Sequence, residues 1–420
     1  MPLRSKFVLS SLQSTKLTDV EQCRRVIAHV DIDCFFASAE VARDPSLIDR
    51  PVIVAGSSSR GVVLSPNYEA RRFGVRSAMP VAKARALCPH AIYVVPDHAY
   101  YRELSKKFYD ILRTLTPLVE MVSVDEAYLD LSGSRWRLGS PLSAASKVRE
   151  AVFEEMALPV SVGIGTSKTV AKIGSQMAKP KPQRDRVIYG SGIFAVEPGH
   201  ERAFLFALPV TYLPGVGPKS ASRLASVGVT KVSDLFNVPR ATLTSIFGRS
   251  TESILSYAEG NDPRSVEIDR ERKSLGHERT FDRDVTARED LVVELRDLCE
   301  EIAEGLSKMS IGGKTVSVKV KFSDFSVVSV SESYAEMVFS YRDILLRSTE
   351  LLRKIDLKLP VRLLGVSLSN LRSIDAPKQL YLDRQEKDAE EMVRLQRVIS
   401  EINQRYGRRS VHRASTRPRP

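Results

Sequence analysis

Residues 30–36 are Val30-Asp31-Ile32-Asp33-Cys34-Phe35-Phe36, and residues 123–130 are Ser123-Val124-Asp125-Glu126-Ala127-Tyr128-Leu129-Asp130. Each segment follows or lies in an apolar, β-branched run of the kind that forms strands of an α/β sheet. Because strand ends in such a sheet lie at one edge, we expect folding to bring Asp31, Asp125 and Glu126 together. Converging carboxylates bind hard divalent cations, usually Mg²⁺. The two segments therefore predict a metal-dependent enzyme acting on phosphate esters, with two ions roughly 3.5–4 Å apart.

The composition predicts a basic, multidomain protein. The chain has 420 residues, of which 43% are hydrophobic and 27% charged, enough for about two to four globular units with ordinary cores. Its formal net charge of +12 indicates a polyanionic partner. No apolar run approaches the roughly 18 residues needed to span a bilayer, so we expect nucleic acid rather than a membrane.

The four cysteines indicate neither a zinc site nor a disulfide framework, because Cys23, Cys34, Cys88 and Cys299 lie far apart without C-x-x-C spacing. This pattern favours a reducing, cytoplasmic setting. Residues 1–25 lack the continuous apolar core and the cleavage site of a signal peptide. We therefore expect an N-terminal extension, to which the sequence assigns no function.

The pattern of apolar residues predicts the elements around the acidic segments. We expect a strand from Val26 that ends at Asp31, with His29 as a core residue, and a hairpin of residues 51–56 and 61–65. A short helix from Asn67 should end at Gly74, and an amphipathic helix should run from about Tyr100 until Pro117 ends it. A strand over residues 160–165 should follow, and then a helix bearing Lys168, Lys172 and Lys179. The basic and phenolic groups of residues 67–76 suit a triphosphate, although a solvated basic helix has the same composition.

Residues 213–219 predict a contact with the DNA backbone. The stretch Leu213-Pro214-Gly215-Val216-Gly217-Pro218-Lys219 leads into a helix over residues 220–225. Its glycines permit positive φ, and the amides at the helix N-terminus form a nest for a phosphate. This pattern is typical of a helix-hairpin-helix, which grips DNA without reading its sequence, and a plain interhelical turn is the alternative.

A charged linker that begins near Asp262 precedes a second, α+β unit. Its helix carries an apolar stripe of Leu291, Leu295, Leu298, Ile302 and Leu306. We expect Gly312-Gly313 to close the connection from this helix to a strand. In that strand the apolar Val316, Val318, Val320 and Phe322 alternate with the polar Thr315, Ser317, Lys319 and Lys321. Residues 326–333, a helix over 341–354 and residues 361–368 complete this unit. Lys319 and Lys321 suit contacts with a duplex backbone.

With these motifs assembled, the chain resembles the Y-family of DNA polymerases, of the bacterial DNA polymerase IV type. The resemblance runs from about Val26 to Leu382 and rests on residues 31–37, 67–71, 123–130, 213–217 and 273–280, which occur in the family's order. It implies a multidomain α/β and α+β fold, the right-hand polymerase. Its parts would be an N-terminal extension (1–25), a palm (26–198) with small fingers inserted at about 41–98, a helix-hairpin-helix thumb (199–262), a linker (263–275), an α+β little finger (276–375) and a tail (376–420).

The resemblance implies template-directed addition of deoxynucleotides to a primer 3′ end, with error-prone synthesis across damage and no proofreading exonuclease. Asp31, Asp125 and Glu126 would hold two Mg²⁺, with Mn²⁺ as an alternative, and the Ile32 carbonyl would be a backbone ligand. Asp33 has no metal role in the family pattern.

The resemblance also implies substrate contacts. Phe36 matches the steric gate, whose ring leaves no room for a ribose 2′-hydroxyl. The nucleotide-binding positions match Phe35, Phe36, Tyr68, Arg71 and Lys179, and the expected DNA contacts are Gly215, Gly217, Lys219, Lys319 and Lys321. The partners would be primer-template DNA and dNTPs, bound by a monomer in the cytoplasm, at the nucleoid.

The tail resembles a docking peptide. Gln379, Leu380 and Leu382 match the motif by which bacterial polymerases bind the sliding clamp, with Asp383 where a Phe is common. An ordinary polar tail is the alternative. Residues 384–406 predict an amphipathic helix, and the arginine-rich end after it suits nonspecific DNA binding.

Two other classes of protein share some of these features. A catalytically silent adaptor of the same fold would bind DNA without chemistry, but it would not need three metal ligands and a gate. A phosphohydrolase with Asp31 as nucleophile would leave the helix-hairpin-helix and the basic C-terminal unit unexplained.

Overall fold

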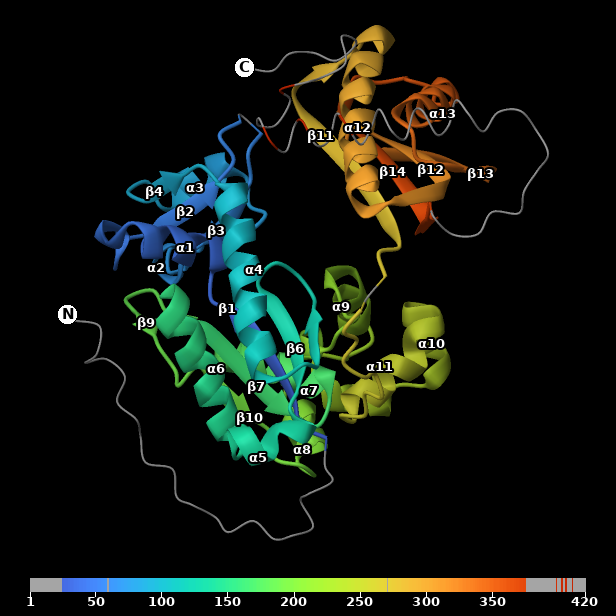
Figure 1. The fold of residues 1–420 in the computed structure, drawn as a ribbon. Helices are drawn as coiled ribbons and strands as arrows, with labels where there is room; N and C mark the ends of the chain where they lie inside the picture. Colours follow the sequence, from blue (N-terminus) through green and yellow to red (C-terminus); the bar gives the residue numbers. More distant parts are fainter. Residues whose placement is uncertain are drawn as a thin grey trace. The chain divides into compact units, whose positions relative to one another are not determined.

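The structure, a computed structural model, describes residues 25–58, 60–269, 271–374, 398, 402, 405 and 410 (Figure 1). The chain divides into two units, residues 1–270 and 271–420. None of the helices in these described ranges is long and apolar enough to cross a membrane.

A five-stranded sheet organises the first unit, with β1 (Ile27–Ile32) at its centre. β1 pairs antiparallel with β6 (Glu126–Asp130) on one side and with β7 (Val160–Gly165) on the other. β5 (Val119–Met121) and β10 (Ile193–Ala195) complete the order β10-β7-β1-β6-β5. The predicted strand over 160–165 is confirmed, and the strand predicted from Val26 begins and ends one residue later than expected.

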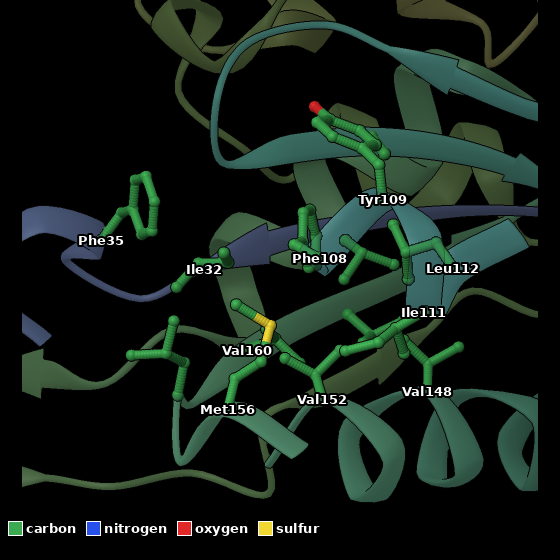
Figure 2. Close-up of a cluster of buried hydrophobic side chains, with 14 of the residues drawn as sticks. Ile32, Phe35, Phe108, Tyr109, Ile111, Leu112, Val148, Val152, Met156 and Val160 are labelled. Carbon is green, nitrogen blue, oxygen red and sulfur yellow. The ribbon is translucent and has the colours of Figure 1, made fainter. Parts of the chain in front are cut away.

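Helices α4 (His98–Leu115) and α6 (Pro141–Met156) cover one face of this sheet. Figure 2 shows Phe108, Ile111 and Leu112 of α4 packed among Val148, Val152 and Met156 of α6 and the strand residues Ile32 and Val160. The helix predicted from Tyr100 therefore exists, with Asp97 as its N-cap, and Pro117 follows its end. This core holds β1 with Ala28, Val30 and Ile32 inward.

The opposite face of the sheet carries Ile27, His29 and Asp31, because side chains alternate along a strand. Helix α7 (Lys168–Ala178) covers this face, where its Ala171 packs against Ile27 and Tyr128. α7 lies very close to β7 at Gly163, where a Cβ atom would collide with the Ala171 carbonyl oxygen and the Ser175 amide nitrogen. Only glycine at position 163 permits this approach.

A smaller sheet, β3-β2-β4, lies beside the first one. It consists of β2 (Val52–Ala55), β3 (Val63–Pro66) and β4 (Ile92–Val94), flanked by α1 (Phe35–Arg43), α2 (Tyr68–Arg71) and α3 (Val81–Leu87). The β2–β3 pairing confirms the predicted hairpin. The helix expected to end at Gly74 ends at Arg71, because Phe73 and Gly74 donate to the carbonyls three residues earlier in tighter turns. Strands β8 (Lys181–Pro182) and β9 (Val187–Ile188) form a short hairpin, and α5 (Arg135–Leu138) precedes α6.

Short helices complete the first unit around their own apolar core, which includes Leu205, Leu224, Leu235 and Leu243. They are α8 (Glu201–Phe206), α9 (Pro218–Ala225), α10 (Arg240–Phe247) and α11 (Thr251–Ala258). Short 3₁₀ helices lie at Pro45–Leu47, Ser132–Ser134, Val210–Tyr212, Val232–Asn237 and Gly248–Ser250. Val170 and Ile173 of α7 belong to this core as well, so α7 is packed on two sides.

The second unit is an antiparallel sheet covered by two helices. Its strands β11 (Ser274–Val285), β12 (Ile311–Phe322), β13 (Val327–Val338) and β14 (Val361–Ser373) have the order β11-β14-β12-β13. Helices α12 (Arg288–Met309) and α13 (Tyr341–Arg353) pack on its apolar face, where Val316, Val318 and Val320 are buried as the alternation predicts.

Two sequence expectations for these regions were wrong. Gly312 and Gly313 do not close a connection but lie within β12, and a Cβ on Gly313 would sit 3.0 Å from Leu368 Cβ of the neighbouring strand. Asp262, expected in a charged linker, is buried, and it accepts hydrogen bonds from the Thr169 amide (3.1 Å) and hydroxyl (2.9 Å) at the start of α7. Both errors concern contacts with distant segments.

Candidate active site

Two of the three predicted carboxylates are direct neighbours across a strand pair. Asp31, near the end of β1, lies opposite Glu126, the first residue of β6, in the antiparallel register of these two strands. The Ile32 amide donates to the Asp125 carbonyl at 2.9 Å, which fixes the third acidic residue just before β6. The Tyr109 hydroxyl donates to the carbonyls of Ser123 and Glu126 and so holds the turn that carries Asp125. The fold thus brings Asp31, Asp125 and Glu126 to one sheet edge.

Two lysines of the α7 segment form ion pairs with two of these three carboxylates. Lys179 Nζ lies 2.6 Å from Asp31 Oδ1, and Lys172 Nζ lies 2.9 and 2.8 Å from the two carboxylate oxygens of Glu126. They reach the carboxylates because Asp31 and Glu126 lie on the face that α7 covers. The sequence suggested Lys179, but it gave no reason to choose Lys172 over Lys168.

His29 extends the charged group. Its Nδ1 lies 2.8 Å from Ser175 Oγ of α7, and its Nε2 lies 3.5 Å from Glu126 Oε2. Burial lowers the pKa of His29, so the ring is neutral at pH 7. His29 and Lys172 together hold the pKa of Glu126 to about 2, whereas burial raises the pKa of Asp31 against the opposing effect of Lys179. The period-two alternation of β1 is the sequence signal that places His29 and Asp31 on one face.

Asp125 is less constrained than its neighbours. It is partly exposed, and its Oδ1 accepts a hydrogen bond of 2.5 Å from Ser123 Oγ. Within the part of the chain that the structure describes, no three acidic, histidine or cysteine side chains are grouped tightly enough to hold a metal ion. The oxygens of Asp31 and Glu126 contact the ammonium groups of Lys179 and Lys172 instead.

Phe36 lies at the start of α1, beside the carboxylates, and stacks on Tyr101 of α4. The ring centroids are 4.3 Å apart with an interplanar angle of 13°, and the Tyr101 hydroxyl donates to Glu40 at 2.6 Å. Tyr101 is 2% exposed, so Phe36 rests on a fixed platform. Tyr101 was not among the residues predicted from the sequence, although position 101 lies on the same apolar helix side as Leu104 and Phe108. The side chain of Phe35, the other predicted nucleotide-binding phenylalanine, is buried in the core.

The remaining nucleotide-binding candidates lie on the α2 side of the same edge. The Tyr68 hydroxyl donates to Asp33 Oδ1 at 3.1 Å. Arg71 donates through Nε to the Pro66 carbonyl at 3.0 Å, and its guanidinium lies 5.3 Å from the centre of the Tyr68 ring. Tyr68, Arg71 and Lys179 therefore present one phenol and two cations next to the carboxylates.

The predicted DNA contacts belong to elements other than those that form this edge. Gly215 has a φ of +91°, which favours glycine, and Gly217 is the N-cap of α9, followed by the exposed Lys219. In the second unit, Lys319 pairs with Glu278 at 2.8 Å, and Lys321 lies 4.8 Å from the centre of the Phe325 ring. The predicted clamp residues Gln379, Leu380 and Leu382, and nearly all of residues 384–406, lie outside the described residues.

The chain is similar to known proteins over most of its length. Residues 30–176 match the impB/mucB/samB family, and residues 272–382 match the impB/mucB/samB family C-terminal domain. The DNA polymerase IV of Desulfatibacillum aliphaticivorans is 37% identical over 391 residues, which are 93% of this chain and 96% of the relative. The DNA polymerase IV of Treponema denticola is 38% identical over 366 residues, which are 87% of this chain and 90% of the relative.

Solved structures share this fold. A Y-family DNA polymerase chimera of Dbh and Dpo4 superposes with a TM-score of 0.75 at 26% identity, covering 83% of this chain and 99% of that chain. DinB from Sulfolobus solfataricus has a TM-score of 0.57 at 26% identity, with the same coverage of both chains. An insertion ternary complex of Dbh DNA polymerase has a TM-score of 0.60 at 26% identity and covers 83% of this chain and 99% of that chain.

Proposed function

The chain belongs to the Y-family of translesion DNA polymerases, in its DNA polymerase IV group, and we propose that Asp31, Asp125 and Glu126 are the carboxylates with which it carries out nucleotidyl transfer. The observation that carries this proposal is the cross-strand pairing of Asp31 with Glu126, with Asp125 attached by its carbonyl to Ile32. We infer template-directed extension of a primer 3′ end by dNTPs, with no proofreading site in the chain.

The donor set of this edge fits divalent cations of the Mg²⁺ type. Carboxylate oxygens from Asp31, Asp125 and Glu126, with the Ile32 carbonyl, are the hard ligands that Mg²⁺ and Mn²⁺ prefer. Lys172 and Lys179 pair with two of the carboxylates, so these lysines would have to move aside for Asp31 and Glu126 to bind cations. Two bound ions would activate the primer hydroxyl and stabilise the leaving pyrophosphate.

Other residues of the chain position the nucleotide. Tyr68, Arg71 and Lys179 would donate to the triphosphate, where their hydrogen bonds stabilise the charge that develops during the reaction. Phe36, supported by Tyr101, would lie under the sugar and exclude a ribose 2′-hydroxyl. The φ of +91° at Gly215 and the exposed Lys219 support a phosphate contact at the N-terminus of α9, and Lys319 and Lys321 would contact the duplex from the second unit.

We further propose the cellular context of the enzyme. It would act as a monomer in the bacterial cytoplasm, on DNA of the nucleoid, and Gln379, Leu380 and Leu382 would dock on the sliding clamp. The clamp motif in the sequence and the bacterial origin of similar DNA polymerases IV support this assignment.

Primer extension tests the carboxylate assignment. Purified protein, Mg²⁺ and dNTPs are mixed with a labelled primer-template, beside an Asp125→Ala, Glu126→Ala double variant. We expect extension to fall by at least about a thousandfold, because the variant loses two of the three carboxylates proposed to hold the cations that stabilise the transition state. Asp110→Ala is the matched control, because Asp110 is an exposed carboxylate of α4 that pairs with Lys106 and Arg113 on its own helix, and this variant should extend normally.

The alternatives predict different results. DNA binding without extension by the wild-type chain would favour the catalytically silent adaptor. Extension that survives the double variant would place the metal ligands elsewhere. Phosphate release from a monoester, abolished by Asp31→Asn, would favour the phosphohydrolase.

A further inference from the structure

Asp33 is a buried carboxylate to which the nucleotidyl-transfer mechanism assigns no role. Its side chain is 4% exposed, although it lies only two residues from Asp31. Burying a carboxylate is costly unless hydrogen bonds compensate, so its partners indicate what it does. Those partners belong to two different elements.

One partner comes from the central sheet. Ser161 Oγ of β7 lies 2.9 and 3.0 Å from the two carboxylate oxygens of Asp33, and Ser161 is fully buried. The Asp33 backbone is fixed as well, since its amide donates to the Pro159 carbonyl at 2.9 Å and its carbonyl accepts from Ser38 Oγ at 2.5 Å. The carboxylate therefore has one position relative to β1 and β7.

The other partner is Tyr68, the first residue of α2. Its hydroxyl donates to Asp33 Oδ1 at 3.1 Å, and the ring is largely buried. α2 is attached to the smaller sheet through its N-cap Asn67, which accepts hydrogen bonds from the Ala70 and Val52 amides. Within the described contacts, Asp33 is thus the polar link between the Tyr68 hydroxyl and the strand that carries Asp31.

We propose that Asp33 is the positioning residue for Tyr68, and that it sets the place of the phenol at the triphosphate end of the nucleotide site. This inference rests on the proposed role of Tyr68 as a triphosphate contact. A phenol carries one proton, so Asp33 holds the hydroxyl before a nucleotide binds, and the proton turns to a phosphate oxygen when one does. Ser161 still donates to Asp33 in that state, so the carboxylate keeps a hydrogen bond.

Single-nucleotide insertion kinetics test this link. The variants are Asp33→Ala, Tyr68→Phe and the double variant, and kcat and KM for the dNTP are measured separately. We expect Asp33→Ala to raise KM about tenfold with kcat within about threefold, because the phenol loses the hydrogen bond to a charged group that holds it in place before the nucleotide binds. We expect the double variant to be no worse than Tyr68→Phe alone, because both changes remove the same hydroxyl contact. Primer-template affinity, measured by fluorescence anisotropy, should not change.

The outcomes distinguish a failure of the proposed role of Tyr68 from a failure of the proposed role of Asp33. If Tyr68→Phe leaves KM unchanged, the triphosphate role of Tyr68 is wrong, and this inference falls with it. If Tyr68→Phe raises KM but Asp33→Ala does not, or if the two effects add in full, Asp33 does not act through the hydroxyl. Should Asp33→Ala fail to fold, Ser161→Ala replaces it in the same cycle. That variant keeps the buried carboxylate, and we expect a smaller rise in KM, about threefold, that is again absent in the Tyr68→Phe background.

Discussion

At the scale of single residues, the site depends on pairs that join distant segments. Three such pairs connect the α7 segment or α4 with the sheet edge or with α1. They are Lys172 with Glu126, Lys179 with Asp31, and Tyr101 with Phe36. In the pairs of Glu126 with Lys172 and of Phe36 with Tyr101, the first member carries the proposed chemistry and the second holds it in place. The Phe36–Tyr101 stack gives a direct test of this division.

Phe36→Ala should weaken sugar discrimination. Removal of the ring opens space where a 2′-hydroxyl would lie, so we expect the preference for a dNTP over the matching rNTP to fall by about 100-fold, the scale of steric selection in a pocket. Single-nucleotide insertion with both nucleotides measures this ratio.

Tyr101→Phe is the control for that experiment. It keeps the ring under Phe36 and removes only the hydroxyl that donates to Glu40. We expect this control to retain most of the discrimination. Unchanged discrimination in Phe36→Ala would show that another residue excludes the 2′-hydroxyl.

The carboxylates could be predicted from the sequence, but their partners could not. Asp31, Asp125 and Glu126 each follow or lie in strand-forming runs, and strand ends meet at a sheet edge. Lys172 and Asp262 act through elements distant in sequence, and no local pattern records which face of β1 meets α7. Phe35 illustrates the same limit, because its position beside Phe36 did not reveal that it packs in the core.

At the scale of elements, α7 carries much of the site. It supplies Lys172, leads into Lys179 and covers the face of β1 that bears Asp31. Its first turn is fixed by the buried ion pair of Lys168 with Glu120 and by Asp262, which accepts from Thr169. An anion at a helix N-terminus is also favoured by the helix dipole.

Asp262→Ala should destabilise the first unit. The change leaves the buried Thr169 amide without its acceptor, and we expect a loss of about 1–3 kcal/mol in the free energy of unfolding at pH 7. Chemical denaturation monitored by far-UV circular dichroism measures it. Asp269→Ala, at an exposed aspartate of the same segment, should be neutral.

The loss of stability caused by Asp262→Ala should disappear in acid. Burial raises the pKa of Asp262, but hydrogen bonds from Arg264 and Thr169 outweigh burial and leave the pKa below its usual range. Its stabilising effect is therefore complete above the unfolded pKa of about 4 and is lost as the pH falls through the lower folded pKa. The stability difference between wild type and Asp262→Ala should shrink on acidification below about pH 4. A difference that stays constant down to pH 3 would contradict this ionic role.

At the scale of the whole molecule, the fold class predicted from motif order is confirmed by the match to Y-family structures. In the second unit, alternation along residues 315–322 predicted which side chains are buried. The Gly312-Gly313 pair misled the prediction, because glycines that punctuate a loop and glycines that admit a neighbouring strand look alike in sequence.

The proposed docking on the sliding clamp rests on residues 379–382 of the sequence. Changing Gln379 and Leu380 to Ala should abolish stimulation of synthesis by the sliding clamp, while extension without the clamp stays within about twofold, because the motif is separate from the catalytic residues. Gln385→Ala is the control for loss of a nearby amide. Stimulation that persists in the double variant would remove the docking assignment.

Gly163 has a consequence that reaches beyond packing. Its missing side chain lets α7 lie against β7, and α7 brings Lys172 to Glu126. The spacing between helix and sheet therefore sets the charge balance of the catalytic edge. A position that has no functional group, and that touches no substrate, would be among the least replaceable in this enzyme. An engineer who left every reactive residue untouched could still inactivate it by adding one methyl group.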